Sequence, residues 1–221
     1  MQFQRYAIYF TPQTSALADF GAKWFGWDMA NGIRLDPLAT DEIIKTPQRY
    51  GFHATIKPPF RLAAGHSPQD LERALEQFCD RSFKVSLEGL KLAQLGSFIA
   101  LVPLGDSHDL NALAADTVEA LDVFRAPITE AELVKRRSKG LSVIQDGLLM
   151  AWGYPYVMEE FRFHMTLTGR LPKALRSEVI EALEEHLQQV PLRPFTIDAL
   201  SLVGEDMQGF FHLIHRYALS N

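Results

Sequence analysis

Two histidines in this chain stand in the same short motif and suit acid–base chemistry. His53 is followed two positions later by Thr55, and His164 is followed two positions later by Thr166, so the motif is His-x-Thr in both cases. Because the ordinary pKa of an imidazole is about 6.5, one histidine can accept a proton while the other donates one. A threonine hydroxyl can hold an anionic oxygen by donating a hydrogen bond. Two such pairs facing each other would suit in-line displacement at a phosphate.

Both motifs lie in segments with the alternation of a β-strand. In residues 52–57 (Phe-His-Ala-Thr-Ile-Lys) and 163–168 (Phe-His-Met-Thr-Leu-Thr), every second residue is apolar. Side chains alternate between the faces of a strand, so each motif predicts a buried face and a polar face. The third polar position is Lys57 in one copy and Thr168 in the other. We expect Lys57 to bind phosphate and, as a nearby cation, to lower the pKa of His53, which makes that histidine the base.

Each motif opens one copy of a long internal repeat. After each motif, the copy continues with a predicted helix, a short strand and, past a glycine-containing loop, an apolar strand. These are residues 67–79, 83–87 and 98–102 in the first copy, and residues 172–190, 195–199 and 210–214 in the second. Two further helices are expected between the copies. One lies near 110–124, and the other begins at 129, where Thr129 and Glu132 form a capping-box pattern; Gly140 is expected to interrupt this second helix.

This order of elements predicts an α+β protein. We expect a duplicated bilobal fold, with two mainly antiparallel sheets that face a central cleft and helices outside. The chain would form a single bilobal domain. Lobe 1 is expected at approximately 1–107, a helical connection at approximately 108–152, and lobe 2 at approximately 153–221.

Several other residues are candidates for binding the substrate. Arg136 and Arg137 lie in the basic run 135–139, which forms either a solvated helix face or part of a phosphate site. Arg162 precedes the second motif on the same predicted strand face as His164 and either reaches a phosphate or base or pairs with a carboxylate. Tyr50 and Tyr154 either stack on a base or sugar or pack in the protein.

The net charge and composition limit the classes of binding partner that we expect. The formal net charge is −5, which argues against long nucleic acid but is compatible with a small basic pocket. The single cysteine, Cys79, has the spacing of a buried helix residue, and no apolar stretch is long enough for a signal peptide or a membrane span. We therefore expect a cytoplasmic protein without a membrane partner. The oligomeric state stays open.

A metal site is not expected. The spacing His212-x-x-His215 would suit a metal pair on a helix, but this segment is a predicted strand, where the two side chains point to opposite faces. We predict catalysis without a metal or other cofactor, since proton transfer and positioning by the two histidines can share the barrier.

The paired motifs on a duplicated α+β scaffold resemble the 2H phosphoesterase superfamily. The longer strings at 49–60 (RYGFHATIKPPF), 152–156 (WGYPY) and 161–170 (FRFHMTLTGR) resemble a bacterial branch named for phosphonate metabolism. The resemblance covers essentially the whole chain. It implies a central cleft and hydrolysis or ligation at 2′,3′-cyclic or related cyclic phosphates, with catalytic roles for His53, Thr55, His164 and Thr166. It also makes a ribose cyclic phosphate of phosphonate breakdown a candidate substrate.

Three functions are compatible with this sequence. The one we favour is a cyclic phosphodiesterase that uses two-histidine acid–base catalysis. The second is a module that binds a nucleotide or a phosphorylated sugar without turning it over. The third is an enzyme that joins or trims RNA ends, against which the acidic net charge argues.

Overall fold

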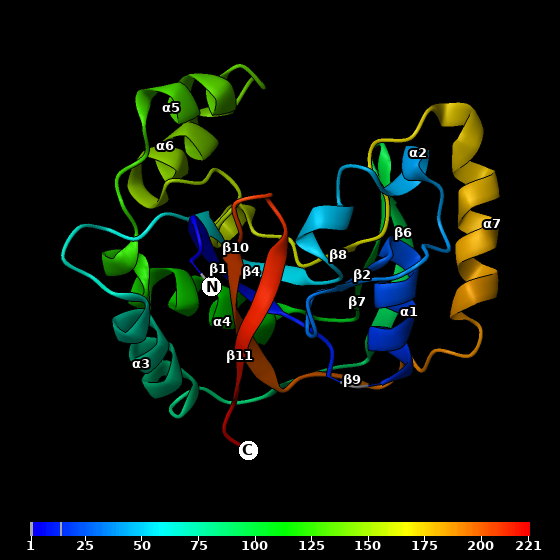
Figure 1. The fold of residues 1–221 in the computed structure, drawn as a ribbon, viewed down its shortest axis with the longest axis horizontal. Coiled ribbons are helices and arrows are strands. Elements are labelled where there is room, and N and C mark those ends of the chain that lie inside the picture. The colour runs from blue at the N-terminus through cyan, green and yellow to red at the C-terminus, as the bar shows by residue number, and fades with distance from the viewer. Residues whose placement is uncertain (1, 14) are drawn as a thin grey trace.

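The computed structural model describes residues 2–13 and 15–221, and its centre is a seven-stranded antiparallel sheet (Figure 1). The strand order is β11-β10-β1-β4-β8-β7-β6. The strands are β1 (Arg5–Phe10), β4 (Ala54–Phe60), β6 (Gly89–Leu95), β7 (Phe98–Leu104), β8 (Met165–Thr166), β10 (Ala199–Glu205) and β11 (Phe211–Ala218). Two small sheets pair β2 (Trp27–Asp28) with β3 (Ile33–Arg34) and β5 (Val85–Leu87) with β9 (Phe195–Ile197). The expected α+β class with mainly antiparallel strands is confirmed.

The two halves of this sheet meet at a narrow seam between the motif strands. β4 and β8 pair at Ala54 and Met165, so the two expected sheets are joined into one. Each copy's later strands lie beside the motif strand of the other copy. The second copy's β10 and β11 lie on the side of β1 and β4, and the first copy's β6 and β7 lie on the side of β8. Each end of the sheet therefore contains strands from both of the expected lobes, 1–107 and 153–221. A sequence repeat defines the strand pairs but not which motif strand each pair joins.

The helices lie around this sheet, and one pair of them projects from it. They are α1 (Ala16–Phe25), α2 (Asp41–Ile44), α3 (Pro68–Cys79), α4 (His108–Ala120), α5 (Glu130–Arg137), α6 (Val143–Trp152) and α7 (Arg176–Leu187). In Figure 1, α3 and α4 lie at the β10–β11 end of the sheet, α1 and α7 lie at the β6–β7 end, and α5 and α6 project from one corner. None of the described helices is both long and apolar enough to cross a membrane.

The ends of the helices follow from capping residues. The Ser67 side chain accepts a hydrogen bond from the Asp70 backbone at the start of α3, and Thr129 and Glu132 form the predicted capping box of α5. Gly140 has φ +74°, a left-handed conformation that glycine adopts readily, in the turn that separates α5 from α6. The expected interruption by Gly140 is confirmed.

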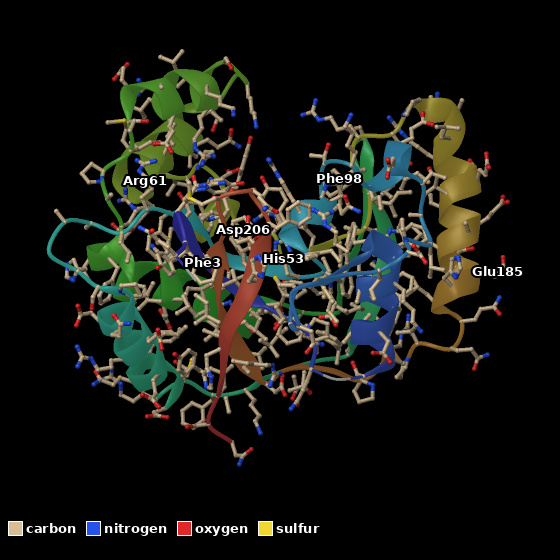
Figure 2. All side chains as sticks on the ribbon, in the orientation of Figure 1. Phe3, His53, Arg61, Phe98, Glu185 and Asp206 are labelled. Atoms are coloured by element: carbon tan, nitrogen blue, oxygen red, sulfur yellow. The ribbon has the colours of Figure 1, made fainter. Side chains whose placement is uncertain are left out.

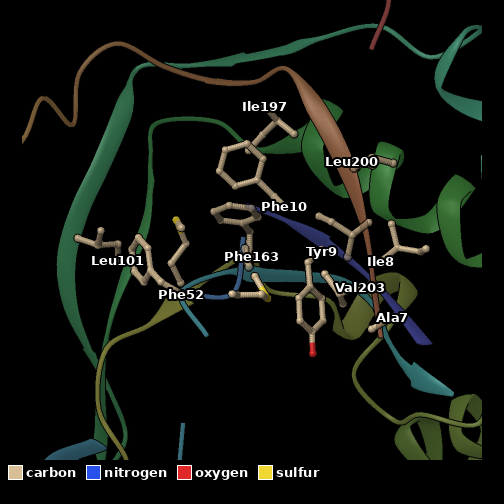
Figure 3. Packing of buried hydrophobic residues seen from close by; sticks show 14 of the residues in the cluster. Ala7, Ile8, Tyr9, Phe10, Phe52, Leu101, Phe163, Ile197, Leu200 and Val203 are labelled. Carbon is tan, nitrogen blue, oxygen red and sulfur yellow. The ribbon is translucent and has the colours of Figure 1, made fainter. Parts of the chain in front are cut away.

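The apolar faces of the two motif strands belong to one hydrophobic core. The members from the two strands are all buried: Phe52, Ala54, Ile56, Phe163, Met165 and Leu167. Figure 3 shows Phe52 and Phe163 among rings and aliphatic side chains from several strands, with the hydroxyl end of Tyr9 turned away from Phe10. Cys79 is buried in this core, as its helical spacing predicted. Since the apolar faces are fixed in the core, the His and Thr side chains of both His-x-Thr motifs must point to the other side of the sheet.

Candidate active site

The strand register brings the two motifs together. Ala54 of β4 lies opposite Met165 of β8 in an antiparallel pair, and both side chains are buried. Extending this register by one residue in each direction puts Thr55 opposite His164, and His53 opposite Thr166. Side chains directly opposite one another in such a pair have Cβ atoms about 4.5–5.5 Å apart. The four polar side chains of the motifs therefore form a compact group with approximate two-fold symmetry.

Both histidines are oriented by the same backbone contact. Nδ1 of His53 lies 3.0 Å from the carbonyl oxygen of Gly51, and Nδ1 of His164 lies 2.8 Å from the carbonyl oxygen of Arg162. A carbonyl oxygen can only accept, so Nδ1 is the donor in both rings. In the neutral form, Nε2 of each ring then carries the lone pair that can accept a proton. For His53, the hydroxyl of Thr55 lies 3.1 Å from Nε2 and donates to it.

Gly51 shapes the backbone that carries the first of these carbonyl groups. It has φ +68°, where a side chain is strained, and a Cβ at this position would lie 2.9 Å from the Cβ of Met29. Glycine is therefore required at the turn that precedes His53.

The surroundings of His53 keep its imidazole neutral. Its ring stacks on the ring of Tyr9, with centroids 3.7 Å apart and planes at 19° (Figure 2 shows His53 in the middle of the molecule). The pKa of His53 is lowered to about 4, mainly by burial; the hydrogen bond to the Gly51 carbonyl opposes this shift, and the nearby His164 adds to it. The low pKa expected for His53 therefore arises from burial and not from Lys57.

Lys57 lies outside the site, contrary to the sequence-based expectation. In the pairing of β1 with β4, Tyr9 lies opposite Thr55 but Ile8 lies opposite Lys57, so Ile56 is an extra residue in a β-bulge. The bulge turns Lys57 to the other face, where it is buried and its Nζ lies 3.1 Å from both Oδ1 of Asp122 and the carbonyl oxygen of Val118. The prediction that every second side chain of the strand lies on the same face fails for Lys57, because the bulge adds one residue before it.

Arg162 and Arg137 are also outside the site. β8 begins at Met165, so Arg162 is not on a strand face; its guanidinium is exposed and donates to the carbonyl groups of Glu159 and Phe161. Arg137 pairs with Asp146, with 2.7 Å between Nε and Oδ1. Arg162 therefore contacts backbone carbonyls and not the carboxylate that was the alternative to a phosphate, and Arg137 lies on an exposed helix face, where it pairs with Asp146.

A cavity of about 530 Å³ lies beside the motifs. Of the residues predicted for the site, it is lined by His53, Thr55, Thr166, Thr168, Tyr50, Arg136 and Tyr154. The hydroxyl of Thr168 is buried, accepts from the backbone N–H of Ile99 at 3.0 Å and donates to the carbonyl of Gly169 at 2.8 Å. His164 is not among the lining residues; it lies immediately before β8, with its ring centroid 5.7 Å from that of Phe98.

Several lining residues were not predicted for the site from the sequence: Arg5, Tyr9, Lys135, Lys139 and Arg170. Arg170 continues the every-second-residue series of His164, Thr166 and Thr168 by one step, so alternation carried further would have found it. Lys135 and Lys139 lie in the basic run 135–139, of which only Arg136 and Arg137 were predicted to bind the substrate. Tyr9 lies in a strand of apolar neighbours and gave no signal.

No group of three or more His, Cys, Asp or Glu side chains among residues 2–13 and 15–221 is arranged to hold a metal ion. Of the histidines considered for a metal pair, His212 has its Nε2 2.8 Å from Oδ2 of Asp206, and His215 has its ring against Tyr217.

Residues 55–212 match the family described as "Protein of unknown function (DUF1045)". The chain belongs to the DUF1045 family. This DUF1045 chain is also 37% identical over 218 residues to a protein named "Ribose 1,5-bisphosphate phosphokinase PhnN" from Janthinobacterium sp. (strain Marseille), covering 93% of this chain and 48% of the relative. It is 35% identical over 211 residues to a protein of the same name from Laribacter hongkongensis (strain HLHK9), covering 93% of this chain and 49% of the relative. The chain spans about half the length of these curated relatives.

Solved structures that are similar to this DUF1045 chain over 100% of both chains include LigT of E. coli in its apo form, at 12% identity and a TM-score of 0.46, and LigT complexed with 3′-AMP, at 11% identity and 0.47. Another, titled a phosphoesterase, has 13% identity and a TM-score of 0.44. The likeness is distant, so the chemistry of this site is argued from its own residues.

Proposed function

We propose that this protein is a metal-independent phosphoesterase that hydrolyses a cyclic phosphodiester by two-histidine acid–base catalysis. The observation that carries the proposal is the symmetric pair of His-x-Thr motifs, in which both rings are fixed through Nδ1. Nε2 of His164 has no hydrogen-bond partner among the described residues, and Nε2 of His53 accepts from Thr55, which the attacking water replaces in the proposed reaction. The cationic cavity beside them is suited to an anionic substrate.

In the proposed reaction His53 is the base and His164 is the acid. Nε2 of neutral His53 takes a proton from water as the water oxygen bonds to phosphorus. Protonated His164 gives its proton to the ester oxygen whose bond to phosphorus breaks, so the ring opens to a phosphomonoester and a free hydroxyl. In the proposed complex the Thr55 hydroxyl leaves Nε2 of His53 and donates to one non-bridging oxygen, while the Thr166 hydroxyl donates to the other, so that both stabilise the charge that builds there. Proton exchange with solvent then restores both rings.

The substrate is proposed to be a nucleoside 2′,3′-cyclic phosphate or a ribose cyclic phosphate of phosphonate metabolism. The relatives' printed name concerns ribose 1,5-bisphosphate, which supports a phosphorylated ribose for this chain. Tyr50 and Tyr154 line the cavity and are proposed to contact the sugar or base. A phosphorylated metabolite as substrate and a buried, unpaired Cys79 support the cytoplasm as the place of action.

The test is a substrate panel with purified protein in the presence of a chelator. The panel contains α-D-ribose 1,2-cyclic phosphate, its 5-phosphate form and the nucleoside 2′,3′-cyclic phosphates, and products are followed by phosphorus NMR. We expect turnover of at least one substrate, unchanged by the chelator, and loss of that turnover in His53→Ala and His164→Ala. Abolition by the chelator would refute the metal-independent mechanism, and unchanged rates in both variants would refute the assignment of the site.

The two other functions predict different results in binding assays. A binding module would hold an intact cyclic phosphate, measured by calorimetry, without product over hours. An enzyme that processes RNA ends would bind RNA with steeply salt-dependent affinity, because many phosphate contacts release many counterions.

A further inference from the structure

We infer that the cavity contains a second anion subsite, separate from the two histidines, that binds a phosphomonoester at the far end of the substrate. Lys135 and Arg136 on α5, Lys139 just beyond α5 and Arg170 after β8 form this subsite, which we call the cation subsite. The inference rests on the proposed function for the position of the scissile phosphate, and it adds that the substrate carries two phosphate groups.

The charge balance of the cavity is the first observation. Its described lining residues include five lysines and arginines, namely Arg5, Lys135, Arg136, Lys139 and Arg170, and a single carboxylate, Glu132. Arg5 pairs with Glu205, and Glu132 pairs with Arg61, so these charges are already balanced. The four members of the cation subsite have no ion-pair partner within the part of the chain that the structure describes. In a protein of net charge −5, this is a concentrated local excess of positive charge.

Favourable interaction with the helix dipole accounts for only part of this cluster. Basic residues in the last turn of a helix are stabilised by the partial negative charge of its C-terminus, and α5 ends on Lys135, Arg136 and Arg137. Arg137 turns away to Asp146, however, whereas Lys135 and Arg136 face the cavity. Arg170 belongs to no helix and reaches the cavity from the segment after β8. Cations gathered from two segments around one cavity repel one another, and a bound anion would offset that repulsion.

The side chain of Arg136 is held in position without a bound ligand. Its guanidinium carbon lies 4.6 Å from the centroid of the Tyr154 ring, a cation–π contact that orients the side chain at the cavity wall. α5 itself buries none of its residues, and the bidentate pair of Arg61 with Glu132 connects it to the segment after β4. The helix is therefore held mainly by polar contacts and carries its cations on a wall distinct from the sheet.

The size and layout of the cavity fit a substrate with two separated phosphates. At about 530 Å³ the cavity has the volume of a site for a small organic ligand, which is more than one phosphate requires. The histidines lie at the β4–β8 seam, while α5 projects from a corner of the molecule (Figure 1). The substrate class that follows from this layout is a small sugar with a cyclic phosphate at one end and a phosphomonoester at the other.

The test compares ligands that differ only in the second phosphate. Calorimetry measures the affinity of wild-type protein for 3′-AMP and for adenosine 3′,5′-bisphosphate, and for ribose 1-phosphate and ribose 1,5-bisphosphate. We expect the second phosphate to strengthen binding by roughly tenfold or more in at least one pair, the size typical of new hydrogen bonds to charged groups. The double variant Lys135→Ala/Lys139→Ala and the variant Arg170→Ala should lose this gain while keeping their affinity for the monophosphates.

Arg137→Ala is the matched control, because it removes a cation from the same helix but outside the cavity, and it should keep the gain. Equal affinities for the members of both pairs, or variants that weaken monophosphates and bisphosphates alike, would overturn the inference. Binding does not depend on turnover, so the outcomes are separable. A protein that gains affinity from the second phosphate but hydrolyses nothing would disprove the proposed function alone, and one that hydrolyses cyclic phosphates with no such gain would disprove the cation subsite alone.

Discussion

The two His-x-Thr motifs have the same sequence pattern but different surroundings. His53 leads into β4, a strand of seven residues, and its ring is stacked on Tyr9 with Nε2 engaged by Thr55. His164 leads into β8, a strand of two residues, and its Nε2 has no hydrogen-bond partner among the described residues. The first motif is thus a firmly packed element, and the second one leaves its imidazole free for a ligand or a proton.

Under the proposed function, this difference gives two roles to one duplicated motif. The repeat supplies the symmetry, because the same carbonyl contact orients both rings. The surroundings then separate the two copies, because burial holds His53 in the neutral form that a base requires. His164 lacks the stacked partner and the Thr contact that occupy the first ring, which suits a group that exchanges protons with a leaving oxygen.

The largest effect is expected from removing either imidazole. If His53 and His164 are both needed for proton transfer, His53→Ala and His164→Ala should each lower kcat by roughly 10²–10⁴-fold. The double variant should be little slower than the worse single variant, since residues that act as one unit are not additive. Single-turnover kinetics on the best substrate of the panel checks this. A multiplicative loss in the double variant would show that the motifs act independently.

The difference in surroundings also predicts an unusual pH dependence. Because the pKa of His53 is lowered to about 4, this ring stays neutral at any pH above that value and gains a proton only below it. The acid limb of kcat/KM should therefore lie well below the ordinary histidine range, near pH 4, although the limbs belong to the coupled pair. A pH profile with an acid limb at 6 to 7 would contradict the assignment of His53 as the base.

The same pKa shift makes the protein less stable in acid. The unfolded chain binds a proton at His53 at about pH 6.5, while the folded chain does so only at about pH 4. The free energy of unfolding should therefore fall as the pH drops through this window, because the unfolded state holds more protons. Chemical denaturation at pH 7 and at pH 4.5 measures the difference, and the variant His53→Asn should show a smaller one.

How far the sequence predicted the structure depends on the regularity of each segment. The buried faces of both motifs, the capping box at Thr129 and the turn at Gly140 follow from local patterns, and the structure has them. Lys57 was misplaced because a bulge at Ile56 reverses the alternation, and a bulge depends on pairing with β1 and not on β4 alone. The exchange of strands between the copies and the stacking on Tyr9 are tertiary contacts, for which the sequence of one segment holds no signal.

A moderate effect is expected from changing the ring that supports His53. Tyr9→Leu removes the stacked partner, and such contacts contribute about 0.5–1.5 kcal/mol beyond the area they bury. We expect kcat to fall about 2- to 10-fold with a smaller change in KM, because the imidazole loses its fixed orientation. Tyr9→Phe keeps the ring and is the matched control. Equal rates for the Leu and Phe variants, both folded, would argue against a positioning role for the stack.

Lys57 should affect stability and leave catalysis intact. Its Nζ is buried with Asp122 and the carbonyl of Val118. Lys57→Met has a similar volume and leaves Asp122 paired with Arg125, so we expect the free energy of unfolding to fall by about 1–3 kcal/mol. Urea denaturation measures this loss, and kinetics at a temperature where the variant is folded should show nearly the rate of the unaltered protein. A large loss of substrate binding would instead support the sequence-based expectation of a phosphate contact.

The smallest effect is expected at Arg162, where the two motifs differ in the residue that supplies the carbonyl. Gly51 does this for His53 and cannot bear a side chain, whereas Arg162 does it for His164 and carries an exposed one. Only the backbone of Arg162 contacts the imidazole, and its guanidinium donates to two carbonyls away from the cavity. Arg162→Ala should therefore keep kcat and KM within about twofold and change stability by no more than about 0.5 kcal/mol, as is usual for surface positions. A tenfold rise in KM would show that the guanidinium reaches the substrate, and the second motif would then contribute a cation that the first one lacks.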